Sequence, residues 1–297
     1  MERQPYENMN GNGDAREKKH RGIVLLVPLL MLITVALVLY LIVFRVTDLN
    51  VQLQFDPVNN PTRVQPMEEE QLRVALGIES APSYFTFDRE DVEESIEQFN
   101  SRPGQKVFLK LESFEKQSIT HATISVVQRQ GIARVIGSEG TVCVIDREGV
   151  MLENVRVKDS TEEGYPGMIL LKDMILKEIP RKTGAQIKAA NSYQMEVYSR
   201  IIGQMTDLDL LYVKLSGNNV MLAFSEMSIP DAESVTLTTW DGYTVIIDLP
   251  EGEEIREVRA KLRTMVIILE EVRNDPNIHS TGVLRINKAG EATFTPE

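Results

Sequence analysis

The residues best suited to chemistry in this 297-residue chain are three histidines, one cysteine and 44 aspartates and glutamates. His20, His121 and His279 are far apart, and no two stand at a metal-binding spacing such as His-Glu-x-x-His. Cys143 has no second cysteine to pair with and lies in an apolar, strand-like run. We therefore predict no metal site, and we expect Cys143 to be buried packing.

The motifs of nucleotide binding and of nucleophilic hydrolysis are also missing from the sequence. It contains no Gly-x-Ser-x-Gly elbow, Walker loop or Gly-x-Gly-x-x-Gly turn. Acidic pairs such as Glu93-Glu94 and Glu270-Glu271 are frequent, which is expected because the chain contains 44 acidic residues. A glycosidase needs two carboxylates that converge in a cleft, and solvated helix faces explain these pairs better. We predict no catalytic residue, no cofactor and no small-molecule substrate, so the chain does not read as an enzyme.

An apolar segment near the start of the chain determines how the rest is interpreted. Residues 22–44 carry no charge across 23 positions, and a helix of that length covers roughly 30 Å of hydrocarbon. The apolar region of a signal peptide is shorter, about 7–15 residues, and ends at a small-residue cleavage site that is missing here. Four basic residues fall within 16–21, against Arg45 alone just after the segment. We predict a cytoplasmic tail (1–21), a single transmembrane helix (22–44) and an extracytoplasmic body.

The charge of the body disfavours two kinds of main partner. The whole chain has a formal net charge of -12, and the tail, with five Lys/Arg and four Asp/Glu, contributes +1. The remaining residues therefore carry -13. Such an acidic body argues against nucleic acid or an anionic lipid surface as its main partner.

Residues 45–130 have the pattern of a small α+β domain. Apolar residues alternate over 48–55, which predicts a half-buried strand. A short helix follows over 67–77, and Asp88 is the expected N-cap of a second helix. Two strands, over 107–111 and 119–127, complete the order strand, helix, helix, strand, strand. We expect the helices to cover one face of a three-stranded sheet.

Residues 131–297 predict a larger, β-rich domain with packed helices. The expected strands lie at 132–136, 141–145, 150–152, 210–214, 219–224, 234–239, 244–249, 282–286 and 291–295. Helical periodicity predicts helices over 183–205 and 253–273. The second could be a coiled-coil seam, but it covers less than three heptads and has apolar residues off the seam. We therefore expect the helix over 253–273 to be buried on a sheet.

Several short motifs, taken in order, resemble the bacterial cell-division family FtsQ/DivIB. The segment SYFTF (83–87) is similar to the link between the two helices of that family's POTRA module, and IARV (132–135) to the step into its β domain. VIDREGVML (144–152) resembles the family's hairpin, and VLRINKAG (283–290) its terminal strand and turn. Val283 stands where the family often has Asp. The likeness covers residues 15–296.

The resemblance implies a POTRA-like domain over 45–130, an FtsQ/DivIB-type β domain over 131–297, and no enzymatic activity. It implies a cell-membrane scaffold of the divisome, at the division septum, which binds FtsL and FtsB (or DivIC) type partners and helps control septal peptidoglycan synthesis. The family receives its partner at the edge of the last strand.

The matching residues are Leu284, Arg285, Ile286, Glu291, Ala292, Thr293, Phe294 and Thr295. An open edge strand is suited to this role, because its unpaired N–H and C=O groups can add a strand from another chain. An ordinary sheet edge covered by its own loops is the alternative. Two other functions also remain open, namely a membrane-anchored extracytoplasmic cell-wall enzyme and a sensor that signals through its cytoplasmic tail.

Overall fold

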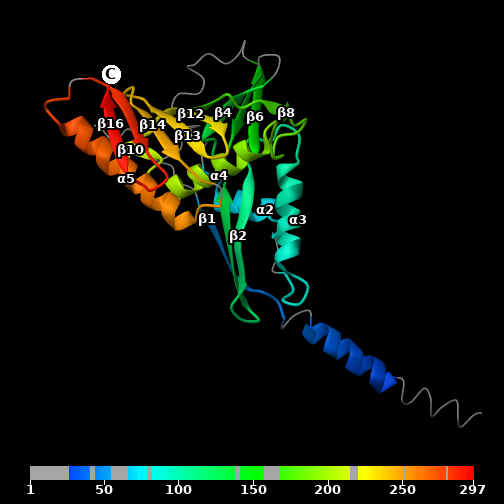
Figure 1. The fold of residues 1–297 in the computed structure, drawn as a ribbon. Coiled ribbons are helices and arrows are strands. Elements are labelled where there is room, and N and C mark those ends of the chain that lie inside the picture. The colour runs from blue at the N-terminus through cyan, green and yellow to red at the C-terminus, as the bar shows by residue number, and fades with distance from the viewer. Residues whose placement is uncertain are drawn as a thin grey trace, which may run out of the picture.

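The computed structural model describes residues 27–40, 44–54, 66–78, 82–137, 141–156, 168–214, 220–250, 252–278 and 280–297. The chain has a mixed α+β fold with a small sheet and a large one, each with its own hydrophobic core. A helix over residues 27–40 extends away from this body (Figure 1).

The small sheet has the strand order β1-β3-β2, with β1 parallel and β2 antiparallel to β3. Its elements are β1 (Asp48–Gln54), α2 (Glu69–Ala75), α3 (Arg89–Asn100), β2 (Leu109–Lys116) and β3 (His121–Gln128). This is the element order that the sequence predicts. The strand predicted to end at residue 111 is too short, because β2 continues to Lys116 past a register shift between Leu111 and Ser113 that interrupts the alternation.

Helix α3 begins at a capping box. The Asp88 carboxylate accepts hydrogen bonds from the backbone N–H groups of Glu90 (2.9 Å) and Asp91 (3.2 Å), and the Asp91 side chain accepts one from the Asp88 N–H. The helix then buries Val92, Ile96 and other apolar residues of one face against the sheet. The predicted N-cap is confirmed.

We expect Asp88→Ala to lower the free energy of unfolding by about 1 kcal/mol, because the first turn of α3 loses its N-cap acceptor. Asp88→Asn is the matched control, since asparagine caps about as well as aspartate. Denaturant unfolding of the full chain in detergent measures both. Equal destabilisation by the two variants would contradict the capping account.

The large sheet has nine described strands in the order β16-β15-β14-β13-β12-β7-β4-β5-β6. In chain order these are β4 (Ala133–Ile136), β5 (Thr141–Ile145), β6 (Met151–Arg156), β7 (Ile169–Lys172), β12 (Phe224–Asp231), β13 (Ser234–Thr239), β14 (Thr244–Asp248), β15 (Gly282–Ile286) and β16 (Ala292–Pro296). The pairs β4–β7, β7–β12 and β14–β15 are parallel, and the others are antiparallel. Two small pairs, β8 (Leu176–Glu178) with β9 (Lys188–Ala189) and β10 (Tyr212–Lys214) with β11 (Val220–Leu222), flank it.

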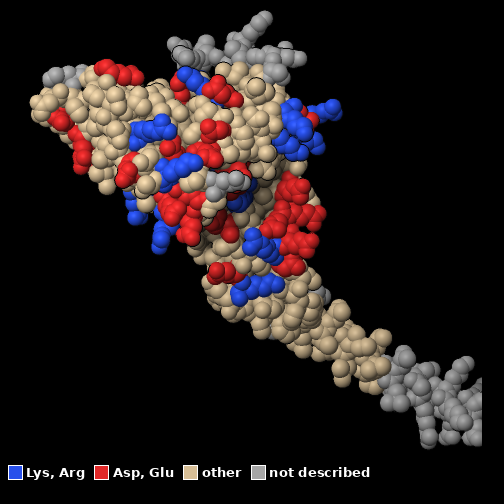
Figure 2. Space-filling view, viewed as in Figure 1, with Lys and Arg blue, Asp and Glu red and all other residues tan. Residues whose placement is uncertain are grey.

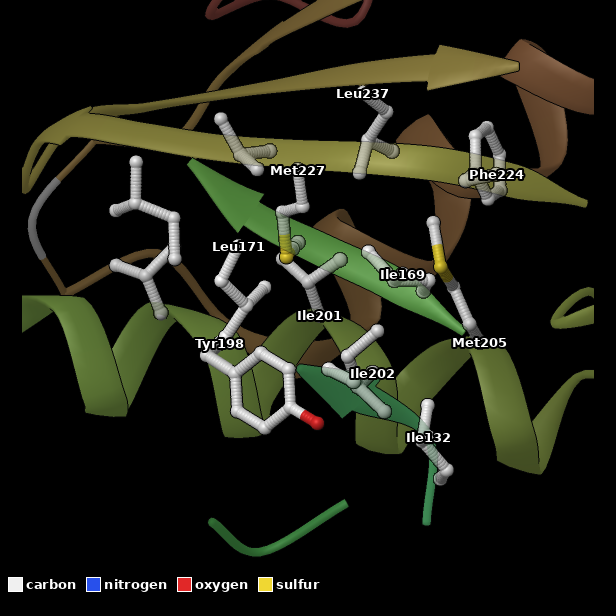
Figure 3. Close-up of a cluster of buried hydrophobic side chains, with 14 of the residues drawn as sticks. Ile132, Ile169, Leu171, Tyr198, Ile201, Ile202, Met205, Phe224, Met227 and Leu237 are labelled. Carbon is white, nitrogen blue, oxygen red and sulfur yellow. The ribbon is translucent and has the colours of Figure 1, made fainter. Parts of the chain in front are cut away.

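Two helices, α4 (Ser192–Asp207) and α5 (Ile255–Asn274), pack in the core of the large sheet. Arg259 of α5 donates to Asp207 of α4 at 3.0 Å, so both helices lie on the same face of the sheet. Figure 3 shows the α4 side chains Ile201 and Met205 directed at β7 and β12. The structure therefore confirms that α5 is buried on the sheet, which the sequence favours over the alternative of a coiled-coil seam.

The helix predicted over 183–205 is wrong in its first half, because α4 begins only at Ser192. Before it, β9 pairs with β8, and Gln186 forms a bridge with Val150. Ile187 belongs to this extended segment and is buried, with 2% of its surface exposed. Its spacing to the apolar residues of α4 matches a helical period, although the residue is not in a helix. The sequence patterns also did not predict β7 and β12, two central strands of the large sheet.

The predicted membrane span is only partly visible in the structure. Residues 22–26 and 41–43 lie outside the described residues, and the part between them is a helix whose apolar side chains are exposed. Among the described residues, no helix combines the length and the hydropathy that a membrane crossing requires.

Candidate functional site

The residues first considered for chemistry do not assemble in the described structure. His121 forms an ion pair with Asp48 at 2.9 Å on the surface of the small sheet, and His20 and His279 lie outside the described residues. Cys143 is fully buried, and burial raises the pKa of its thiol, so its predicted role in packing is confirmed. Within the described residues, no group of three or more metal-ligating side chains converges.

A charged cluster lies between the two sheets, beside a cleft of about 530 Å³. Arg129, just after β3, donates to the carboxylates of Asp146 and Glu148 in the β5–β6 turn, and Lys110 of β2 also pairs with Glu148. The Asp146 carboxylate accepts two further hydrogen bonds, from the N–H groups of Glu148 (2.9 Å) and Val150 (2.8 Å). Both carboxylates are thus engaged in holding the turn against the small sheet.

The two carboxyl groups of this cluster respond to it in opposite ways. Burial raises the pKa of Asp146, and the neighbouring Arg129 only partly offsets this effect. Burial also acts to raise the pKa of Glu148, but the hydrogen bonds and charges of Lys110 and Arg129 outweigh it and lower that pKa. The cluster links the two sheets by charge, and neither acid is left free for acid–base chemistry.

This cluster predicts a pH-dependent contribution to stability. Because folding lowers the pKa of Glu148, its contribution is full above the ordinary value of 4.5 and is lost as the pH falls through the lower value of the folded state. We therefore expect Glu148→Gln to be less stable than the wild type at pH 7, with the difference closing below pH 4.5. Denaturant unfolding across this pH range measures it, with the exposed Glu153→Gln as control. A difference that is constant with pH would contradict the prediction.

The second candidate is the edge of the large sheet formed by β16, whose only neighbour among the described strands is β15. The two strands are antiparallel, with Arg285 opposite Thr293 and Leu284 opposite Phe294. A turn joins them, in which the Asn287 carboxamide oxygen accepts from the Glu291 N–H at 3.0 Å. The predicted site residues of both strands are thereby brought together side by side.

The hydrogen-bond pattern identifies which backbone groups of β16 face outward. Asn287 N–H donates to the Glu291 carbonyl at 3.0 Å, and Glu297 N–H donates to the Thr281 carbonyl at 2.9 Å. Hydrogen-bonded and non-hydrogen-bonded pairs alternate along an antiparallel ladder, so odd-numbered residues of β16 bond to β15. The N–H and C=O groups of Ala292 and Phe294 therefore point away from the sheet, at its open edge.

The side chains of the predicted site divide into three groups. Leu284 and Ile286 are fully buried in the core, so their side chains offer no surface for a partner. Ala292 and Phe294 are half-buried against the core on the helix-covered face. The exposed residues are Thr293, Thr295, Glu291 and Arg285, and the last of these pairs with Asp248 at 3.1 Å.

Gly282 permits the close approach of β16 at the far end of this pair. A Cβ atom at this position would lie 2.4 Å from the Thr295 carbonyl oxygen and 2.7 Å from an edge carbon of the Phe294 ring. We expect Gly282→Ala to displace the end of β16 and to raise the hydrogen-exchange rate of the Thr295 amide, which bonds to β15. Gly290→Ala, with no atom within 4 Å of the added carbon but a φ of +81°, strains only the turn and is the control. Unchanged exchange at Thr295 would contradict this packing role.

Sequence reasoning did not identify the opposite edge, β6, whose end adjoins residues 157–167 outside the described structure. It also did not anticipate the charged cluster between the sheets. The spacing of Asp146 and Glu148 in a turn was visible, but their partners Arg129 and Lys110 come from another sheet. Only the three-dimensional arrangement brings these groups together.

No protein-family profile and no curated protein matches this chain. Among solved structures, it is similar to the major extracytoplasmic domain of the trans isomer of the bacterial cell division protein DivIB from Geobacillus stearothermophilus. The match has 19% sequence identity and a TM-score of 0.26, and it covers 50% of this chain and 97% of that one. At that TM-score the likeness carries no argument about the site.

Proposed function

We propose that this chain is a non-enzymatic scaffold of the bacterial division machinery, anchored in the cell membrane and located at the division septum. It recruits partners of the FtsL and FtsB (or DivIC) type by adding a strand of the partner to β16. The proposal assigns residues 1–21 to the cytoplasm, 22–44 to the membrane, 45–130 to a POTRA-like domain and 131–297 to the partner-binding β domain. The order of the motifs that resemble the FtsQ/DivIB family supports it.

The observation that carries the proposal is the open edge of β16. Its outward N–H and C=O groups, at Ala292 and Phe294, have no strand beside them among the described residues. Proteins usually protect such an edge with lysines, prolines, bulges or a covering element, and within β16 only Pro296 is a residue of this kind. A strand with an unprotected edge is suited to capturing an extended peptide by main-chain hydrogen bonds.

The two faces of the edge define the chemistry of the segment that would bind. On the helix-covered face, the added strand meets Ala292 and Phe294, so apolar side chains suit that side. On the other face it meets the hydroxyl groups of Thr293 and Thr295, so polar side chains suit that side. We propose a partner segment in which apolar and polar residues alternate, which is the pattern of a half-buried strand.

The membrane anchor is supported by residues 22–44, which carry no charge, and by the exposed apolar side chains of the helix over 27–40. An isolated helix with an apolar surface all round is not stable in water, whereas a bilayer accommodates it. The basic residues within 16–21 support a cytoplasmic N-terminus.

Expression of a fluorescent fusion in dividing cells, followed by purification from the membrane, tests the function. We expect fluorescence at the septum and co-purification of a single-pass membrane protein with coiled-coil character. Uniform peripheral fluorescence with no such protein captured would contradict the proposed role. Cleavage of peptidoglycan by the purified chain would instead support the cell-wall enzyme.

A further inference from the structure

An aromatic cluster lies where the helix over 27–40 meets the small sheet. Phe85, in the loop between α2 and α3, stacks on Tyr40 with ring centroids 5.3 Å apart. The ring centroids of Phe85 and Phe44 are 5.1 Å apart in an edge contact, and those of Phe85 and Tyr84 are 5.5 Å apart. Rings from the end of the apolar helix and from the folded body therefore form one continuous group.

Backbone hydrogen bonds hold this loop to the chain segment that leaves the helix. Tyr84 N–H donates to the Phe44 carbonyl at 2.9 Å, and Val46 N–H donates to the Pro82 carbonyl at 2.9 Å. Arg45 and Ser83 form an antiparallel bridge between these bonds. The position of Phe85 beside the helix is thus fixed by the main chain as well as by ring contacts.

The surface around the cluster is apolar and exposed. Phe85 is 55% exposed despite its three ring contacts, and Ile119, in the β2–β3 turn, is 45% exposed. Figure 1 shows that this turn lies at the end of the body nearest the helix. Figure 2 shows a surface without charged atoms that runs from the helix onto that end. Large apolar side chains that are both exposed and clustered mark an interaction site.

Cationic groups border this apolar surface. The Lys116 ammonium lies 4.8 Å from the centre of the Tyr84 ring and donates to the Tyr84 carbonyl at 2.7 Å. Arg45 is exposed directly after Phe44. Aromatic rings with amphipathic character, flanked by lysine and arginine, are the side chains enriched where a protein crosses the membrane–water interface.

We propose that this end of the small domain docks in the outer interface of a phospholipid bilayer, with Phe85 and Ile119 inserted and Lys116 and Arg45 at the headgroups. The inference rests on the membrane anchor of the proposed function. A bilayer fits better than a protein partner, because the apolar surface continues without a break from the helix that would lie in it. Docking orients the body, and the C-terminal edge strand then lies at the end away from the membrane (Figure 1).

Tryptophan fluorescence in proteoliposomes tests the docking. The native Trp240 is replaced by Phe, and Phe85→Trp, Ile119→Trp or Glu112→Trp is introduced into the full chain, reconstituted in phosphatidylglycerol and phosphatidylethanolamine. Lipids with brominated acyl chains quench tryptophan only on close approach. We expect loss of most emission at positions 85 and 119, with little loss at 112, which is exposed midway along β2. The unsubstituted chain, with Trp240 as its one tryptophan, is a second control. Trp240 lies away from the docking end, because its neighbour Asp241 pairs with Arg273 at the far end of α5.

The outcomes separate the docking from the anchor. Vesicle flotation reports attachment, and a chain that does not float would overturn both the anchor and the docking. A chain that floats, but whose tryptophans at 85 and 119 keep their emission, would overturn the docking alone. Equal quenching at 85, 119 and 112 would also overturn it, because the body would then lie along the membrane without a specific inserted end. The use of two probe positions guards against a variant that fails to fold.

Discussion

Ala292→Pro is expected to weaken partner binding by about tenfold or more while leaving the fold intact. The Ala292 N–H points to the open edge, so proline removes one donor offered to the partner and places its ring in the path of the added strand. A lost hydrogen bond of about 0.5–1.5 kcal/mol corresponds to roughly tenfold in affinity at its upper limit, and the ring clash adds to this. Edge strands tolerate proline where the N–H faces outward.

Titration of the full-length chain in detergent against its co-purified membrane partner measures the effect. Thr293→Ser is the matched control, because it keeps both the amide that bonds to β15 and the hydroxyl group on the exposed face. The control is expected to bind nearly as the wild type. Binding by Ala292→Pro that equals the control would remove the edge strand from the mechanism.

Lys261→Ala is expected to lower the free energy of unfolding by about 3–5 kcal/mol. Lys261 of α5 lies in the core beneath the sheet, where it pairs with Glu253 at 2.5 Å and donates to the Asp248 carbonyl at 2.7 Å. The two side chains are 3% and 1% exposed, so removing the lysine leaves the glutamate charged, buried and unpaired. The same change removes an anchor between α5 and the end of β14.

Denaturant unfolding of the full chain at pH 7 measures this loss. Lys288→Ala is the control, since it removes an exposed ion pair with Glu233 and should leave stability nearly unchanged. The double variant Lys261→Met with Glu253→Leu is expected to recover most of the loss, because no charge remains buried. A Lys261→Ala chain as stable as the control would show that Glu253 finds other partners.

Local patterns predicted the terminal region of the fold well. Asp241-Gly242 and the alternation on either side specify the β13–β14 hairpin, and Gly242 has the positive φ of 93° that its turn requires. The apolar stripe of α5 continues over five turns, which is long enough to identify its buried face. The edge position of β16 was also expected, because the FtsQ/DivIB family, which the sequence resembles, receives its partner at the edge of its last strand.

The missing elements have physical causes. β12 forms a hairpin with β13, but register shifts interrupt the alternation of its side chains. β7 pairs in parallel with both β4 and β12, and β12 comes from a distant part of the chain. No turn of two or three residues marks such a pairing, and a four-residue strand such as β7 carries too short a period to recognise. The cluster of Arg129 with Asp146 was unpredictable for the same reason, since it joins two separate sheets.

Residue-resolved amide hydrogen exchange on β16, with and without the bound partner, tests the central claim most directly. The account predicts that the Ala292 and Phe294 amides exchange fast in the chain alone and become protected in the complex. The Thr293 and Thr295 amides, which already bond to β15, serve as internal references with little change. Equally fast exchange of Ala292 and Phe294 in both states would contradict strand addition at this edge.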